Sequence, residues 1–297
     1  MTPWWVAMNG LLLPRAGECA PVDGGWVRSG SCELLRANET RTAAGNRVGA
    51  PMDQHYDGFL ADHYTWMFGA PHAALVEEQL GVLRRAGVAE PTGTGVAVDL
   101  GCGSGFQSIA LARMGHPTIL AVDSSAKLLA ELELYAGDHP AIRVVQDDLC
   151  EVAANLPAGT AELAVCMGDT LTHLPDRTAV TQLLADLYAA LTPGGRLVLS
   201  FRDLSTSRTG TSRIIPVHSD ADTILTCILE YGPDVVTVHD LLHQRTAQRD
   251  WTLSTSAYRK LRIAPDWVAD RLAEVGFRHV RHAPAPRRMT LVTAARQ

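Results

Sequence analysis

The chain has 297 residues, with 26 Lys and Arg against 32 Asp and Glu, and a formal net charge of −6. This mildly acidic balance is unsuited to binding nucleic acid through its phosphates, while 46% hydrophobic and 20% charged residues are ordinary for a globular protein. No apolar run is long enough for a membrane span, and the six scattered cysteines form no C-x-x-C pair, so we expect a cytoplasmic protein with reduced thiols.

Residues 1–51 are rich in Gly, Arg, Ala and Ser and show no sustained period of 2 or 3.6. We expect either a disordered extension or a translation start assigned too early, with Met52 as the alternative beginning. Residues 52–297 are predicted to form one domain. Its first element is predicted to be a helix at about 55–70, running through Asp57–Phe68, with apolar residues at helical spacing.

From Gly95 onward, short apolar runs alternate with amphipathic segments. The predicted strands are Val96–Leu100, Thr118–Val122, Ile142–Val145, Leu163–Met167 and Arg196–Phe201. The predicted helices are 105–114, one capped by Ser124, and Thr178–Leu191, which the turn Pro193-Gly194-Gly195 ends. This alternation indicates an α/β fold with a doubly wound, mostly parallel sheet and helices on both faces.

The pattern changes after the fifth strand. Three strand-like runs follow, at Thr223–Tyr231, Val235–Leu242 and Trp251–Leu261, the first two joined by a Gly-Pro-Asp hairpin signal. We interpret 205–262 as an inserted antiparallel flap, whose surface would also suit a homodimer. A helix from Pro265 to Gly276 and the strands Phe277–His282 and Met289–Ala294 complete a seven-stranded sheet.

The loop after the first strand carries the clearest chemical signal. It contains Asp99, Gly101, Cys102, Gly103, Ser104 and Gly105. Glycines let the backbone approach a ligand closely, and the helix N-terminus beyond them offers free N–H groups. The spacing is G-x-G-x-G, whereas a dinucleotide site has G-x-G-x-x-G. A carboxylate at Asp99 would repel a pyrophosphate and attract the amino group and sulfonium of S-adenosylmethionine (SAM), which favours SAM over a nicotinamide cofactor. We expect Cys102 to be a small packed side chain.

Acidic residues also follow the second and third strands. Asp123, with Ser124 after it, ends the second strand, where an acid can bind both ribose hydroxyls of either SAM or NAD. After the third strand, Asp148 can accept a hydrogen bond from the adenine amine, while the backbone of Leu149 meets a ring nitrogen. Ligands bind at the carboxyl ends of such strands, so these residues predict one nucleoside site.

Together these motifs resemble the class I SAM-dependent methyltransferases over about residues 55–297, and Pro193-Gly194-Gly195 adds to the resemblance. The segment 167–175 is further similar to glycine and sarcosine N-methyltransferases. That similarity implies that Arg202 holds the carboxylate of the substrate; a surface salt bridge is the alternative. Two departures, Asp169 in place of an amide and Asp-Leu after Arg202 in place of Asn-Tyr, leave room for a different acceptor.

Four residues after the fourth strand are candidates for contact with the reacting groups. The backbone of Met167 and Gly168 is expected to touch the adenine or the sulfonium. Asp169 is a candidate catalytic residue that accepts from an amine substrate, or else caps the following turn. His173 is a candidate general base, or else a hydrogen-bonding residue that shapes the loop.

The resemblance implies that the predicted helix at about 55–70 is a lid over SAM, with Tyr64 near the substrate and Trp66 near the cofactor. Packing in the core is the alternative for both residues. His239 and His243 have the spacing of a helical zinc motif but fall in a predicted strand, and we predict no metal site. The expected activity is SAM-dependent methylation of a small molecule, foremost an amine or amino acid nitrogen. Alternatives are O- or C-methylation, a nicotinamide-dependent oxidoreductase, and a SAM-binding protein without turnover.

Overall fold

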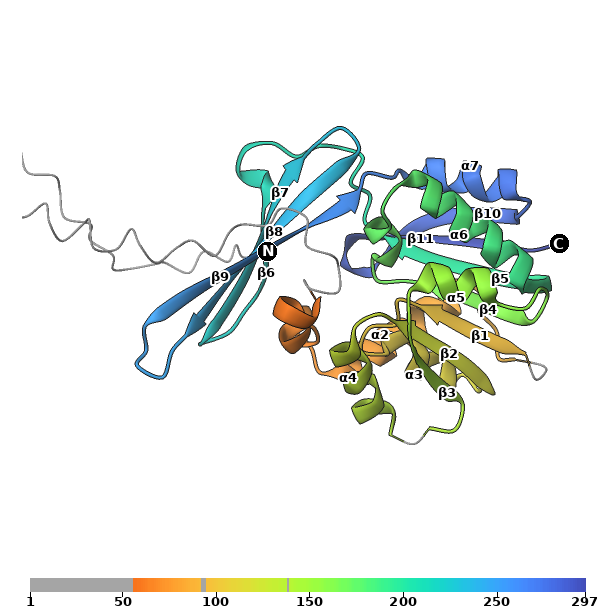
Figure 1. Cartoon of the computed structure of the whole chain (residues 1–297), viewed down its shortest axis with the longest axis horizontal. Helices are drawn as coiled ribbons and strands as arrows, with labels where there is room; N and C mark the ends of the chain where they lie inside the picture. The colour runs from red at the N-terminus through yellow and green to blue at the C-terminus, as the bar shows by residue number, and fades with distance from the viewer. Residues whose placement is uncertain (1–55, 92–94, 138) are drawn as a thin grey trace, which may run out of the picture. The chain divides into compact units, whose positions relative to one another are not determined.

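The computed structural model describes residues 56–91, 95–137 and 139–297 (Figure 1). All of these residues belong to one compact unit. The predictions for residues 1–51, including a beginning at Met52, lie outside the described residues.

One sheet of the fold has seven strands in the order β10-β11-β5-β4-β1-β2-β3 (Figure 1). The strands are β1 (Val96–Leu100), β2 (Thr118–Asp123), β3 (Ile142–Gln146), β4 (Ala161–Cys166), β5 (Leu191–Phe201), β10 (Arg278–Ala285) and β11 (Met289–Ala295). Only β11 runs antiparallel to its neighbours, so the predicted doubly wound, mostly parallel sheet is confirmed. The predicted turn at 193–195 lies within β5, where pairing with β4 shifts register.

Helices cover both faces of this sheet because alternate strand residues point to opposite sides. Apolar residues of α2 (His72–Arg85), α3 (Phe106–Arg113) and α4 (Ala126–Ala136) pack with Ala97 on one face. Apolar residues of α5 (Leu149–Asn155), α6 (Arg177–Ala190) and α7 (Pro265–Val275) pack with Val98 on the other. The helices α2 and α5 were not predicted. Among the described residues, no helix is long and apolar enough to cross a membrane.

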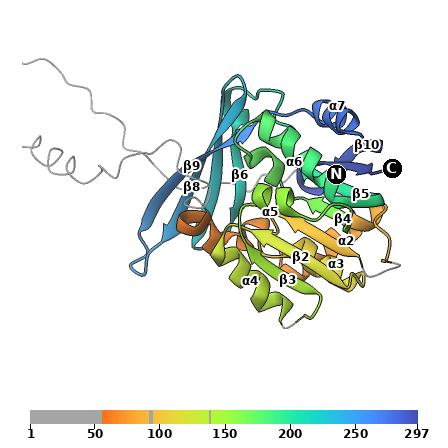
Figure 2. The same cartoon turned by 45° about the vertical axis from the view of Figure 1, so that its right-hand side comes forward.

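The predicted flap is a second, antiparallel sheet between β5 and α7 (Figure 2). It has four strands, β6 (Ile214–Ser219), β7 (Thr223–Tyr231), β8 (Val235–Arg245) and β9 (Trp251–Leu261). The edge strand β6 was not predicted; it contains Pro216, a residue that sheets tolerate at their edges. A small core of its own, which includes Val236, Val238 and Tyr258, stabilises the flap.

The predicted single lid helix is wrong. The segment instead forms three short turns, η1 (Tyr56–Leu60), η2 (Ala61–His63) and η3 (Trp66–Phe68). Its side chains serve two partners: Leu60 packs with residues of the flap, whereas Tyr64 and Phe68 contact Phe106 of α3. Gly69 ends the segment with a left-handed φ of +67°. A straight helix with one apolar face could not pack against both the flap and Phe106.

Candidate functional site

The glycine loop between β1 and α3 is held against the end of β2. The backbone N–H groups of Gly101 and Cys102 both donate to the carbonyl oxygen of Val122, at 2.8 and 2.9 Å. Gly101, Gly103 and Gly105 have φ angles of +72°, +54° and +83°, in the left-handed region that favours glycine. The loop therefore depends on glycine for its backbone path.

Two of these glycines are also needed for space. A Cβ atom on Gly101 would lie 2.3 Å from Cγ2 of Thr170, and one on Gly105 would lie 2.0 Å from Cδ1 of Leu132. Gly105 thus lets α3 pack closely on α4, while Gly101 lets the loop approach the segment after β4. Cys102 is 2% exposed, as expected of a packed side chain, and burial raises the pKa of its thiol.

Asp99 lies beneath the loop and does not line a cavity. It is 1% exposed and accepts a hydrogen bond from the hydroxyl of Ser108 at 2.6 Å. Burial raises the pKa of Asp99 to about 7. The carboxylate is thus bonded within the protein below the glycines, and its expected contact with a ligand stays a prediction.

Asp123, at the end of β2, connects the glycine loop to α4. Its two carboxylate oxygens accept hydrogen bonds from the backbone N–H groups of Gly103 at 2.8 Å and of Ser125 at 2.9 Å. Burial raises the pKa of Asp123. Ser125 caps α4 by accepting from the N–H of Leu128, so the cap lies one residue after the predicted Ser124. Ser124 itself is exposed.

Three consecutive residues after β3, Asp147, Asp148 and Leu149, form the next part of the candidate site. Asp148 caps α5, with Oδ1 accepting from the backbone N–H of Cys150 at 2.7 Å. Asp147 Oδ1 accepts from the N–H of Asp148 at 2.8 Å. Leu149 is the first residue of α5, where helical N–H groups have no partner within the helix.

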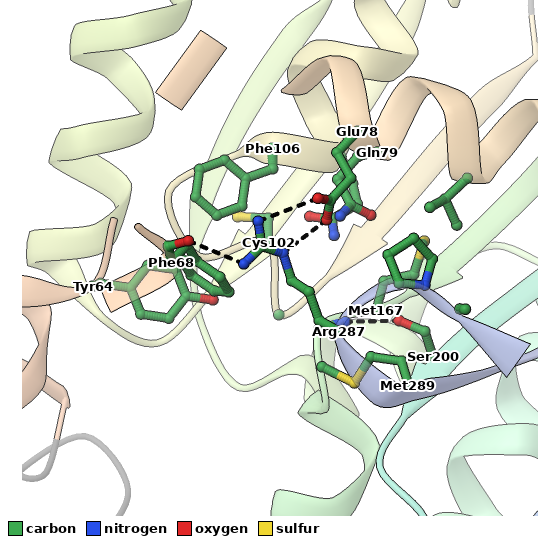
Figure 3. Close-up of a pocket in the computed structure, with 16 residues that line it drawn as sticks. Tyr64, Phe68, Glu78, Gln79, Cys102, Phe106, Met167, Ser200, Arg287 and Met289 are labelled. Atoms are coloured by element: carbon green, nitrogen blue, oxygen red, sulfur yellow. Dashed lines mark hydrogen bonds and ion pairs between the residues drawn. The ribbon is translucent and has the colours of Figure 1, made fainter. Parts of the chain in front are cut away.

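Two adjoining cavities lie along the ends of these strands. We call the larger one, of about 180 Å³, the nucleoside cavity. Its walls include Gly101, Gly103, Asp123, Ser124, Asp147, Asp148, Leu149, Gly168 and His173. The smaller one, of about 40 Å³, we call the hairpin cavity, because the turn between β10 and β11 forms one wall (Figure 3). Tyr64, Gly101 and Gly168 line both cavities, so the two meet over the glycine loop.

The end of β4 lies between the two cavities. Met167 is 3% exposed and lines the hairpin cavity, and its carbonyl accepts from the hydroxyl of Thr170 at 3.0 Å. Gly168 has a φ of +78°, and its N–H donates to Oγ of Ser200 at 3.0 Å. Gly168 lines both cavities, and a Cβ there would meet no atom within 4 Å.

A buried cluster of charges follows β4. Asp169 is 1% exposed and has a left-handed φ of +86°. Its carboxylate accepts hydrogen bonds from the backbone N–H and from Nη1 of Arg202, both at 2.9 Å, and from Nζ of Lys260 on β9. Burial alone would raise the pKa of Asp169, but the charges of Lys260 and Arg202 outweigh it and hold the pKa well below its ordinary range.

This arrangement bears on two predicted roles. Asp169 lines neither cavity, and its carboxylate is already engaged by two cations, so it is poorly suited to accept a proton or an amine. The side chain of Arg202 is 41% exposed despite the ion pair. Lys260 was missed by the sequence analysis. No local pattern marks it, because Lys260 is placed by the pairing of β9 with β8, on the same strand face as the buried Tyr258.

His173 and Tyr64 both line the nucleoside cavity. The ring of His173 stacks on Tyr258 of the flap, with centroids 5.4 Å apart. Tyr64 stacks on Phe106, with centroids 6.2 Å apart, and its hydroxyl would lie 3.3 Å from a Cβ on Gly103. Burial raises the pKa of Tyr64.

Trp66 does not reach either cavity. Its Nε1 donates to Asp220 of the flap at 2.7 Å, and its ring meets His218 edge-on at 4.8 Å. The segment before α2 thus turns Trp66 toward the flap, and the expected contact with the cofactor stays a prediction.

The possible zinc motif lies on β8, as expected. His239 Nε2 is 2.9 Å from Oε2 of Glu230, and His243 is four residues further along the same strand, roughly 13 Å away at strand spacing. Within the described part of the chain, no group of three His, Cys, Asp or Glu side chains is placed to hold a metal ion.

The doubly wound sheet, with a glycine loop after β1 and acidic residues after β2 and β3, has the fold of known methyltransferase structures. Residues 97–195 match the family model described as a methyltransferase domain. The SAM-bound structure of CalS10, an amino pentose methyltransferase from Micromonospora echinaspora, has the same fold. The TM-score is 0.65 at 15% identity, over 80% of this chain and 97% of that one.

Two curated relatives match a shorter stretch. A ubiquinone biosynthesis O-methyltransferase from Xanthomonas axonopodis pv. citri (strain 306) is 34% identical over 111 residues, which is 37% of this chain and 44% of that protein. A glycine/sarcosine N-methyltransferase from Halorhodospira halochloris is 32% identical over 107 residues, 36% and 39% of the two chains. The matches therefore span less than half the length of these relatives.

Proposed function

We propose that this protein is a SAM-dependent methyltransferase that acts on a small molecule. The observation that carries the proposal is the pair of adjoining cavities that Gly101 and Gly168 both line, with Asp123 in the wall of the larger one. The match of residues 97–195 to a methyltransferase domain supports the same activity.

The residues present suit SAM in three respects. Asp123 offers carboxylate oxygens for the ribose hydroxyls, and Asp147, Asp148 and the N-terminus of α5 offer polar groups for the adenine edge. Gly101 has no room for a Cβ and leaves the backbone open to a ligand. SAM supplies an activated methyl group, so the protein has only to position the acceptor and exclude water.

For the acceptor we propose an amine nitrogen, foremost that of an amino acid. Lys260 and Arg202 place two positive charges beside the carboxylate of Asp169. With its side chain 41% exposed, Arg202 can reach a carboxylate of the acceptor as well. His173, in the wall of the nucleoside cavity, is the candidate to remove a proton from the amine.

O- or C-methylation of a small metabolite is the second candidate. The two relatives named above methylate different atoms, one oxygen and one nitrogen according to their names, and so they do not favour either choice. A nicotinamide cofactor is disfavoured by the spacing of the glycines.

A panel of amino acids, simple amines, phenols and carboxylic acids tests the proposal, read by release of S-adenosylhomocysteine. We expect turnover with at least one amino acid, and a raised KM for that substrate in Arg202→Ala with little change for an amine that lacks a carboxylate. Turnover of phenols or acids alone would contradict the proposed acceptor, and saturable SAM binding without any turnover would contradict the proposed enzyme activity.

A further inference from the structure

The wall of the hairpin cavity contains a charge pair. Arg287, in the turn between β10 and β11, and Glu78, on α2, both line this cavity (Figure 3). We propose that this pair binds the amino acid end of SAM, with Arg287 on the carboxylate and Glu78 on the ammonium group. The inference rests on the proposed function, because it assigns a subsite within the same cofactor site.

The guanidinium of Arg287 is held in a defined orientation. Nε and Nη2 lie 2.8 and 3.2 Å from the two carboxylate oxygens of Glu78, and Nη1 donates to the carbonyl of Phe68 at 3.1 Å (Figure 3). Its charge also lies over the ring of Phe68, 5.2 Å from the centroid. The pair thus connects α2, the lid and the β10–β11 turn at the cavity.

The backbone of the turn that carries Arg287 is strained. Arg287 and Arg288 are consecutive non-glycine residues with φ of +59° and +57°. Such left-handed conformations are unfavourable for residues with a Cβ and persist where the surroundings enforce them, often at binding sites.

The position of the pair relative to the nucleoside cavity fits the shape of SAM. The amino acid end extends from the ribose on the side opposite the adenine. With the ribose at Asp123 and the adenine toward Asp148, that end would pass Gly101 and Gly168 and enter the hairpin cavity. A cavity of about 40 Å³ suits the end of one ligand better than a whole acceptor molecule.

The charges of the pair are complementary to a zwitterion. A carboxylate beside Arg287 and an ammonium beside Glu78 would give four alternating charges, and the planar guanidinium suits a carboxylate. Each side chain is 28% exposed, so the pair is accessible without being fully hydrated. Around it, Phe68, Phe106 and Met167 make the rest of the wall largely apolar.

Calorimetric titration with two ligands tests the assignment. S-adenosylhomocysteine carries the amino acid end, whereas 5′-methylthioadenosine has the same nucleoside and lacks that end. We expect Arg287→Gln and Glu78→Gln each to weaken S-adenosylhomocysteine binding at least tenfold and to change methylthioadenosine binding less than twofold.

The chain offers a matched control on the same helix. Glu77 of α2 pairs with Arg113 at 2.6 Å, but both side chains are exposed and away from the cavity. Glu77→Gln should leave the affinity for both ligands unchanged. Arg287→Lys keeps the positive charge but lacks the planar guanidinium. If Arg287→Gln fails to fold, Arg287→Lys replaces it in the test. We expect it to lose less affinity than predicted for Arg287→Gln, and only for S-adenosylhomocysteine.

Equal losses for the two ligands, or no loss for either, would overturn the assignment and leave the pair as a structural contact between α2 and the turn. Wild-type protein that binds neither ligand would overturn the proposed function itself. The two failures are therefore distinguishable in one set of titrations.

Discussion

The carboxylate of Asp123 accepts a hydrogen bond from the backbone N–H of Gly103, 2.8 Å away, and so the end of β2 holds the middle of the glycine loop. The second carboxylate oxygen accepts from Ser125, at the start of α4. One side chain thus fixes the loop, the helix and the wall of the nucleoside cavity. The ligand-binding role proposed for Asp123 and its structural role are carried by the same two oxygens.

Asp123→Ala is therefore expected to weaken SAM binding by about 1–3 kcal/mol, which is roughly 5- to 150-fold in Kd, because charged hydrogen bonds to the ribose are lost. Isothermal titration against the wild type measures the change. Asp62→Ala is the control, since Asp62 is an exposed acid that pairs with Lys127. An unchanged Kd in Asp123→Ala would remove this residue from the site.

Gly105→Ala should destabilise the fold more than Gly115→Ala. Both glycines have left-handed φ, of +83° and +88°, which costs alanine about 1–2 kcal/mol. Only at Gly105 does the new Cβ also meet a neighbour, 2.0 Å from Leu132, which adds about 1–3 kcal/mol of overpacking. Urea unfolding of the two variants measures the difference, and equal losses would show that α3 and α4 can move apart freely.

Lys260→Met should destabilise the protein by about 3–5 kcal/mol at pH 7, because it removes a cation from the buried carboxylate of Asp169. The folded pKa of Asp169 is depressed below its ordinary 3.8, so its contribution is fully present above about pH 4 and is lost as the pH falls further. We therefore expect the difference between wild type and Lys260→Met to shrink from pH 7 to pH 3. A difference independent of pH in urea unfolding would mean that Lys260 acts through packing alone.

Asp99 should make SAM affinity depend on pH near neutrality. Its pKa is raised to about 7 by burial, and a nearby cationic ligand favours the ionised form, so binding should release a proton. Affinity should rise with pH through about 7, by at most about tenfold per pH unit below that value. Asp99→Asn should flatten the profile. If the pH dependence were retained in that variant, another group would be responsible.

Much of the fold was predictable because its signals are local. The apolar run 96–100, the glycines at 101, 103 and 105, and Asp123 are close in sequence to the turns they build, and their arrangement follows from strand and helix periodicity. The helix α2 also carries such a signal, in the helical spacing of Val76, Leu80 and Leu83, although it was not predicted.

The rest of the site depends on contacts between distant segments. Lys260 meets Asp169 only because β9 pairs with β8 in a register that places Lys260 opposite Val236. Arg287 reaches Glu78 through a strained turn that no local propensity favours. Trp66 turned to the flap for a similar reason, since its partner Asp220 lies on a strand connection far along the chain.

The measurement that tests the central claim most directly is isothermal titration of the full chain with SAM, and with NADH for comparison. We expect saturable binding of one SAM per chain and no saturable binding of NADH. Absence of SAM binding by folded protein, or saturable binding of NADH in its place, would contradict it.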